Sequence, residues 1–172
     1  MDADTATSLR RLLDEQPVAA LATLHRGSEP AVSMVPFVLP PGAAHLLIHV
    51  SALATHTADM QAHPRVALLV TDEARAGVMP QARARVSLQC EVQMLARGRA
   101  HGTADDPGPG SDAAYAAARA TYLARFPAAA ITFELADFTL ARLTPVAARL
   151  VAGFGSAHAL VGERLQDWLR RR

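Results

Sequence analysis

The sequence predicts a mainly β protein in which six or seven antiparallel strands form a barrel with peripheral α-helices. Three observations predict this fold class. The segment Ala84–Met94 alternates strictly between apolar and polar residues, which is typical of a strand with one buried face. Most predicted strands follow one another closely enough to pair as hairpins. The helical segments do not alternate regularly with strands, as they would in a parallel α/β sheet.

Length and composition indicate a single domain over residues 1–172. The chain has a formal net charge of +1 and 51% hydrophobic residues, which suffices for one sizeable core. The balanced charge argues against nucleic-acid binding. No apolar run approaches the roughly 18 residues that cross a bilayer, and no signal peptide is readable. Because the single Cys90 also cannot form an internal disulfide, we expect a cytoplasmic protein with no membrane partner.

The first half of the chain predicts two helices and four strands. Leu9, Leu12 and Leu13 recur at helical spacing, which predicts a helix over about residues 5–16. Pro36 cannot donate to a ladder, so we expect it at a bulge or an open edge, where backbone groups are free for a ligand. The predicted strands are Val18–His25, Ala31–Leu39, His45–Val50 and Val66–Thr71, with a helix over Ala52–Ala62 before the last of them.

The second half begins with the polar loop Asp72–Gln81 and the alternating strand, which starts near Arg83. Asp112 can cap a helix that follows a glycine- and proline-rich loop. Gly153-Phe154-Gly155 lacks the third glycine of a dinucleotide-binding turn, so we reject that fold. Ser156 can cap a last helix over about residues 156–170. The other predictions are the loop Arg97–Ser111, a helix over Ala113–Arg125, and strands over Thr132–Leu135, Phe138–Leu143 and Val146–Val151.

Seven histidines invite a metal hypothesis that their spacing does not support. His45 and His49 share one face of a strand, and His56 and His63 share one face of a helix. Neither pair fits a HExxH-type zinc motif, and no acidic residue or cysteine completes a set. We therefore expect no metal site. Cys90 falls on an apolar strand face, where a thiol is inert, and no residue is identified as catalytic.

One junction between a predicted strand and a predicted helix has groups that suit the binding of an anion. The segment Ile48–Met60 reads as an apolar strand that ends at Ser51 and is followed by a helix. A helix start collects unpaired backbone N–H groups, and Thr55, His56 and Thr57 add side-chain donors beside them. Because the chain contains no lysine, the cation at such a site has to be arginine or histidine.

Several segments, in this order, resemble a known family. They look like the pyridoxamine 5'-phosphate oxidase-like proteins with an FMN-binding split barrel, and most of all like their HugZ-like, haem-utilisation branch. The resemblance covers about residues 18–157. The segments that carry it are Pro30–Phe37, Leu46–Met60, His63–Leu69, Ala136–Leu140 and Ala148–Ala157.

The resemblance implies a homodimer of split barrels with one FMN at each of two equivalent sites in the subunit interface. A phosphate near charge −2 needs several donors and at least one cation, and Arg85 can supply a forked pair of donors. Carried over by position, the backbone of Ser33, Met34, Val35 and Pro36 would lie beside the flavin ring. The residues at the phosphate and ribityl end would be Ser51, His56, Thr57, Arg85 and Gln89.

Two departures from the vitamin-synthesising members affect the phosphate site. Those members resemble an Arg-Met-Val-Leu pattern at Ser33–Pro36 and a Ser-Arg-Lys motif near Ala54–His56. The loss of both cations should weaken FMN binding or leave Arg85 and His56 to neutralise the phosphate. We therefore expect FMN affinity to fall as pH rises and His56 loses its proton.

Three functional hypotheses stay open. The first is an FMN-dependent oxidoreductase that acts on an unidentified small molecule, with the cofactor carrying the redox chemistry. The second is a haem-binding protein on the same dimeric barrel, with a histidine as the axial group. The third is a scaffold that no longer binds FMN. The residues do not identify the substrate or the electron donor.

Overall fold

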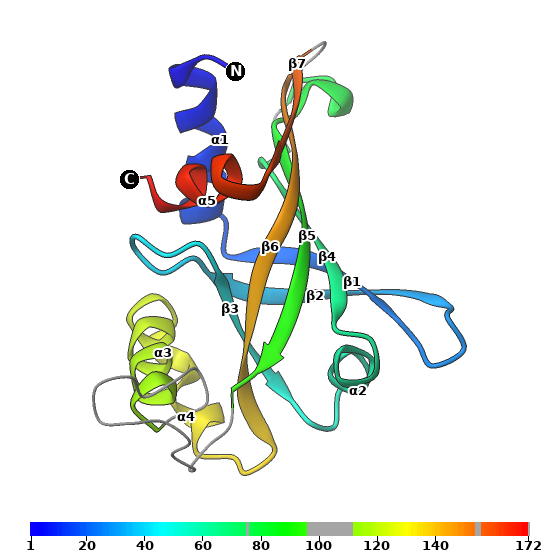
Figure 1. Cartoon of the computed structure of the whole chain (residues 1–172), viewed down its shortest axis with the longest axis vertical. Helices are drawn as coiled ribbons and strands as arrows, with labels where there is room; N and C mark the ends of the chain where they lie inside the picture. The colour runs from blue at the N-terminus through cyan, green and yellow to red at the C-terminus, as the bar shows by residue number, and fades with distance from the viewer. Residues whose placement is uncertain (75, 96–111, 154–155, 172) are drawn as a thin grey trace.

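A computed structural model describes residues 1–74, 76–95, 112–153 and 156–171. The chain forms one antiparallel sheet in the order β3-β2-β1-β4-β5-β6-β7, and β3 also pairs with β6. That pairing closes six strands into a barrel with β7 outside it (Figure 1), which confirms the predicted mainly β split barrel. The strands are β1 (Val18–Leu24), β2 (Pro30–Val38), β3 (Leu46–Ser51), β4 (Arg65–Thr71), β5 (Arg85–Met94), β6 (Phe138–Gly153) and β7 (Ser156–Val161).

The first and last helices lie side by side near one end of the barrel (Figure 1). The Trp168 Nε1–H donates to the Ala6 carbonyl, and the Arg10 Nε–H donates to the Leu169 carbonyl, each at 3.0 Å. In the described part of the chain, no helix is both long and apolar enough to cross a membrane. The helices are α1 (Ala3–Glu15), α2 (Thr55–Ala62), α3 (Asp112–Arg125), α4 (Ala130–Phe133) and α5 (Gly162–Arg170), with 3-10 turns η1 (Pro80–Ala82) and η2 (Pro127–Ala129).

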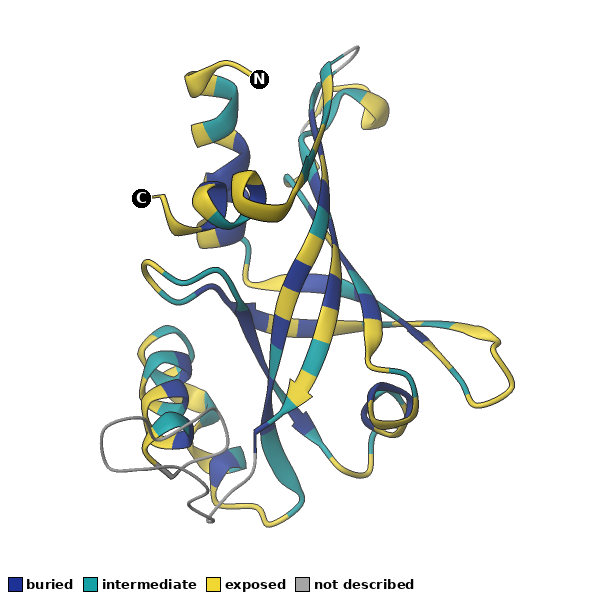
Figure 2. Cartoon of the chain, in the orientation of Figure 1, coloured by how far each residue is buried: buried dark blue, intermediate teal, exposed yellow. Residues whose placement is uncertain are grey.

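The predicted alternation of β5 is confirmed. Val86, Leu88 and Cys90 are buried in the barrel core, whereas Arg85, Ser87 and Gln89 face outward (Figure 2). Burial raises the pKa of the Cys90 thiol to about 12, so this group stays protonated and inert, as expected. One face of β5 is therefore part of the core, and the other is available for a ligand.

Two predictions for the region after residue 130 were wrong. The segment Thr132–Leu135, predicted as a strand, contains the end of α4 and a turn. The strands predicted over Phe138–Leu143 and Val146–Val151 are one continuous strand, β6. Pro145 is tolerated inside it because the register with β5 shifts at Gln89/Cys90, opposite this proline, and a bulge needs no ladder donor there.

The predicted last helix was wrong in its first third. Ser156–Val161 is the strand β7, in which exposed and half-buried residues alternate, and α5 begins only at Gly162. That glycine has φ +56°, a conformation that lets the chain turn sharply from strand to helix. The helix predicted from Ala52 begins at Thr55. The predicted turn at Gly153–Gly155, the loop at 97–111 and the cap by the Asp112 side chain lie wholly or partly outside the described residues.

Candidate functional site

Two rows of residues, each paired with its neighbour on the next strand, run across the outward face of the barrel wall. The ends of these rows carry exposed apolar side chains, among them Met34, which is 66% exposed, and Val32, which is 73% exposed. Between the ends, four of the eight residues are alanines and a fifth is Leu69, so much of the face is apolar with small side chains. The rows are Met34, Ala20, Leu69, Ser87, Arg149, Ala159 and Val32, Ala22, Ala67, Gln89, Ala147, Val161.

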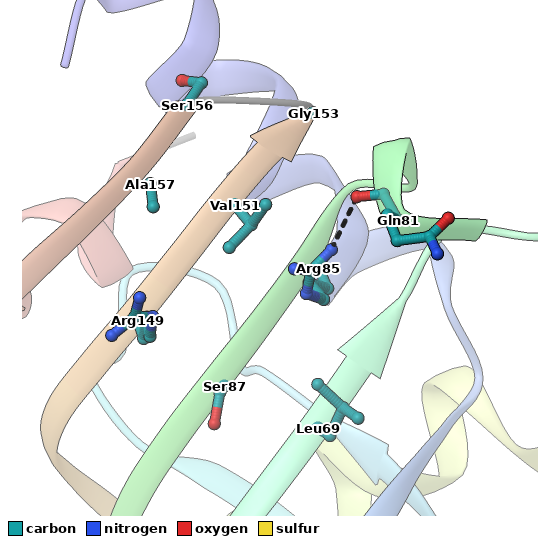
Figure 3. A pocket seen from close by; sticks show the side chains of 9 residues that line it. All are labelled: Leu69, Gln81, Arg85, Ser87, Arg149, Val151, Gly153, Ser156 and Ala157. Atoms are coloured by element: carbon teal, nitrogen blue, oxygen red, sulfur yellow. Dashed lines mark hydrogen bonds between the residues drawn. The ribbon is translucent and has the colours of Figure 1, made fainter. Parts of the chain in front are cut away.

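A pocket of about 370 Å³ opens on this outward face where β4, β5, β6 and β7 meet (Figure 3). Two arginines, Arg85 and Arg149, line it together with the hydroxyl groups of Ser87 and Ser156. No acidic side chain among the described residues lines it. The remaining lining residues are Leu69, Gln81, Val151, Gly153 and Ala157.

Backbone carbonyls hold Arg85 at the wall of this pocket. Its Nη1 donates to the carbonyls of Gln81 and Arg83, each at 3.2 Å, and the Gln81 bond is drawn in Figure 3. Between the described residues, no ion pair involves Arg85 or Arg149. Both positive charges are therefore available to an anion.

The open edge predicted at Pro36 is confirmed. Residues 30–36 of β2 pair with β1, but β3 pairs only with Phe37 and Val38. The Phe37 N–H donates to the Pro17 carbonyl, so the nitrogen of Pro36 lies on the opposite, open side of the strand. Backbone groups along this edge have no strand partner within the described chain.

The four candidate residues on β2 have different surroundings. Ser33 and Met34 line a second pocket, of about 400 Å³, which shares Leu69 with the arginine pocket. The Oγ atom of Ser33 is buried and has no hydrogen-bond partner among the described residues. The Val35 side chain belongs to the barrel core, so only its backbone can face a ligand. Of the predicted site residues, Met34, Arg85 and Gln89 lie on the outward face on which the arginine pocket opens.

The candidate phosphate group at the start of α2 lies elsewhere in the subunit. Ser51, His56 and Thr57 line neither of these pockets, and in Figure 1 α2 lies toward the end of the barrel opposite the tip of β7. The Ser51 hydroxyl donates to Asp137 Oδ2 at 2.5 Å, and the Thr57 hydroxyl donates to the Ser51 carbonyl at 2.7 Å. Both hydroxyl hydrogens are thus engaged within the chain.

Several backbone donors at this junction are engaged as well. The N–H of Leu53 donates to Ser51 Oγ, and the N–H groups of Ala52, Ala54 and Thr57 donate to carbonyls. Burial lowers the pKa of His56 from its usual 6.5, so this side chain is largely neutral at pH 7. Within one subunit, the junction offers an anion fewer donors than the sequence suggests.

Two features of the structure could not be located from the sequence. Arg149 enters the pocket because β6 places it opposite Ser87, and this register cannot be read from either strand alone. Asp59 of α2 accepts hydrogen bonds from Thr23 at 2.8 Å and from His25 Nδ1 at 2.8 Å, which fixes the β1–β2 hairpin to α2. Within the described residues, no three potential metal ligands gather at one point.

Comparisons with known proteins point to one family. The family described as "Pyridoxamine 5'-phosphate oxidase" matches residues 6–152. The chloroplastic non-canonical haem oxygenase HOZ of Arabidopsis thaliana is 29% identical in an alignment of 159 residues that covers 90% of this chain and 42% of that protein.

Two solved structures share the fold. A haem binding protein from Mycobacterium smegmatis superimposes with a TM-score of 0.77 at 27% identity, over 97% of this chain and 62% of that one. HutZ, the haem storage protein of Vibrio cholerae, superimposes with a TM-score of 0.65 at 21% identity, over 90% of this chain and 92% of that one. The chain thus spans less than two thirds of the chloroplast and mycobacterial proteins.

Proposed function

The chain belongs to the pyridoxamine 5'-phosphate oxidase family, and we propose that it binds haem on the outward face of its barrel. The observation that carries the proposal is the combination of a face that bears small apolar side chains with the arginine pocket beside it. Haem is a flat, apolar ring with two carboxylates on one edge, so it needs an apolar surface and cations at one end. The haem-related names of the mycobacterial and chloroplast relatives support this choice over other flat anions.

The described residues on this face suit the carboxylate edge of haem better than the iron at its centre. Arg85 and Arg149 suit the two carboxylates, because guanidinium groups bind carboxylates with paired hydrogen bonds. No histidine lines either described pocket on this face, so an axial ligand to the iron would come from outside them. When bound, haem would supply oxygen or electron-transfer chemistry that depends on that ligand.

FMN is the second candidate, and the open edge of β2 favours it. An isoalloxazine ring has polar atoms along its rim, and the edge of residues 30–36 that faces away from β1 offers backbone hydrogen-bonding groups to them. The backbone of Ser33 to Pro36 would then contact the ring, with Arg85 and Gln89 toward its phosphate and ribityl end. Under this alternative the chain is an oxidoreductase that acts on a small molecule.

Either ligand is proposed to lie between two copies of the chain. The exposed apolar side chains at the ends of the rows give the outward face a surface that a second copy would cover. The junction at Ser51, His56 and Thr57 lies apart from Arg85 within one subunit, and a two-fold dimer can bring such separated groups together. Figure 1 shows the β1–β2 hairpin extending away from the barrel, where it can reach a partner.

Absorbance and fluorescence titrations test the proposal. We expect the purified protein to develop a Soret band on addition of haemin, saturating at one haem per subunit, with micromolar or tighter affinity. A higher affinity for FMN, measured by quenching of its fluorescence, than for haem would favour the second candidate. A protein that binds neither would be the scaffold that has lost its cofactor.

A further inference from the structure

We infer that Arg149 and Arg85 form one subsite for a doubly charged anionic group, with the hydroxyls of Ser87 and Ser156 at its edge. The shared chemistry is that of two carboxylates or one phosphate, so the inference covers the haem carboxylates and the FMN phosphate alike. It rests on the proposed function only in taking that group to be part of a flat ligand. It assigns an anion-binding role to Arg149 and fixes the direction of the ligand on the face.

The sheet register places the two arginines together. In the β5–β6 ladder Arg85 lies opposite Val151, and Ser87 lies opposite Arg149. Arg85 and Arg149 are therefore diagonal neighbours on the same face, whose Cα atoms are about 7 to 8 Å apart in a regular antiparallel pair. Both side chains line the same pocket (Figure 3), and long guanidinium side chains can converge on one ligand from that separation.

The charge in the pocket is unbalanced. Two like charges on adjacent strands repel each other, and no carboxylate among the nine lining residues offsets them. The Nη1 of Arg85 is held by two carbonyl oxygens, which orient the group but carry no full negative charge. A bound dianion removes this repulsion and satisfies the remaining guanidinium donors with charge-assisted hydrogen bonds.

The position of the pocket gives the ligand a direction. The arginines lie toward the end of the outward face near β7 and η1, and the alanines of the two rows continue away from them. An anionic edge placed at Arg149 thus leaves an apolar ring over Ala67, Ala20 and their neighbours. The reverse orientation would put the anionic edge beside Arg65, which has Glu91 directly opposite it in the register, so the anion would approach a carboxylate there.

Arg65 provides a matched comparison. It is an exposed arginine on the adjacent strand β4, but Glu91 lies directly opposite it in the register. Arg65 does not line the arginine pocket but a separate pocket on the same face, together with Ala67 and Gln89. Replacing Arg65 therefore removes one positive charge from the other end of the proposed ligand face and leaves the lining of the arginine pocket unchanged.

The test combines Arg149→Gln and Arg65→Gln with ligands that have or lack the anion. Each protein is titrated with haemin and with haemin dimethyl ester, and separately with FMN and riboflavin. We expect Arg149→Gln to weaken the binding of the charged ligand, haemin or FMN, about ten- to hundredfold, the range of a hydrogen bond to a charged group. The uncharged member should change less than about threefold, and Arg65→Gln should leave both unchanged. The ligand pair whose charged member loses affinity shows whether the anion is a haem carboxylate or the FMN phosphate.

Several results would overturn the inference. Equal losses for acid and ester would mean that Arg149 supports the fold of the pocket and not the anion. A loss of affinity with Arg65→Gln as large as with Arg149→Gln would show that the effect comes from the overall charge of the protein and not from the subsite. Wild-type binding with no response to Arg149→Gln would refute the subsite but leave the proposed function intact, whereas absence of binding by the wild type would refute both. Arg149 is exposed, so thermal melts should show that its variant is folded.

Discussion

The hydroxyl of Ser51 donates to Asp137 Oδ2 at 2.5 Å and joins the end of β3 to the residue just before β6. Because the bond ends on a carboxylate, we expect Ser51→Ala and Asp137→Asn each to lower the free energy of unfolding by about 1.5 kcal/mol. The double variant should lose little more than Ser51→Ala alone, since Asp137→Asn weakens a bond that Ser51→Ala already removes. Urea unfolding of the four proteins measures this, and additive losses would show that the two residues act independently.

The same bond affects any anion at the start of α2. A phosphate beside Ser51 would approach the negative charge of Asp137, so a site at this junction within one subunit is electrostatically disfavoured. The pocket at Arg85, which has no acidic residue among its described lining residues, is the more favourable place for an anion within one subunit.

Arg85→Ala should weaken the bound flat ligand by about 1.5 to 3 kcal/mol, the contribution of a hydrogen bond to a charged group. The loss is expected because the side chain is positioned by the carbonyls of Gln81 and Arg83 and faces a pocket whose described lining contains no acidic residue. Haemin and FMN titrations measure it. Arg85→Lys keeps the charge but not the forked donors, so it should recover only part of the affinity. Unchanged affinity in the alanine variant would remove Arg85 from the site.

His56 should not control ligand affinity near neutral pH. The sequence alone suggested that affinity falls as this histidine loses its proton, but burial lowers the pKa of His56 below 6.5. The group is then already mostly neutral at pH 7, and its titration lies at more acidic pH. We expect the wild type and His56→Gln to show the same affinity from pH 7 to pH 9 in FMN or haemin titrations. A decrease over this range in the wild type alone would restore His56 as a charged ligand.

His45 should make the protein less stable in mild acid. Burial, with a contribution from nearby Arg142, lowers the pKa of His45 to about 4 from a usual value of 6.5. The unfolded chain therefore takes up a proton below pH 6.5 that the folded chain does not accept until about pH 4, and stability falls as pH decreases through this interval. Urea midpoints measured from pH 7.5 to pH 4 should decline more steeply for the wild type than for His45→Gln. Parallel curves would assign the acid sensitivity to other groups.

The sequence predicted most strands of this fold because their local patterns match their surroundings. Strict alternation identified β5, and Pro36 identified an open edge, since each depends on the chemistry of its own strand. The continuous β6 was missed because Pro145 looks like an interruption until the bulge at Gln89/Cys90 is seen. β7 was missed because Ser156 at the head of an alanine-rich segment also suits a helix cap.

The site was only partly predictable for a related reason. Arg85 and Gln89 follow from the outward face of one strand. Arg149 depends on the register between two strands, and the engagement of Thr57 depends on a carbonyl six residues away. Such pairings are set by tertiary structure, so residue types along the chain do not reveal them.

The exposed outward face should mediate self-association. Met34 is 66% exposed in the row that also contains Arg149, and a charge at its position would be buried without a partner in a dimer. We expect the wild type to sediment as a dimer and Met34→Glu to shift it to a monomer with weaker ligand binding. Ile131→Glu is the control, because Ile131 is 75% exposed on α4, away from this face. Analytical ultracentrifugation distinguishes the two states. A wild-type monomer would refute self-association, whereas a dimer that survives Met34→Glu and dissociates with Ile131→Glu would place the interface elsewhere.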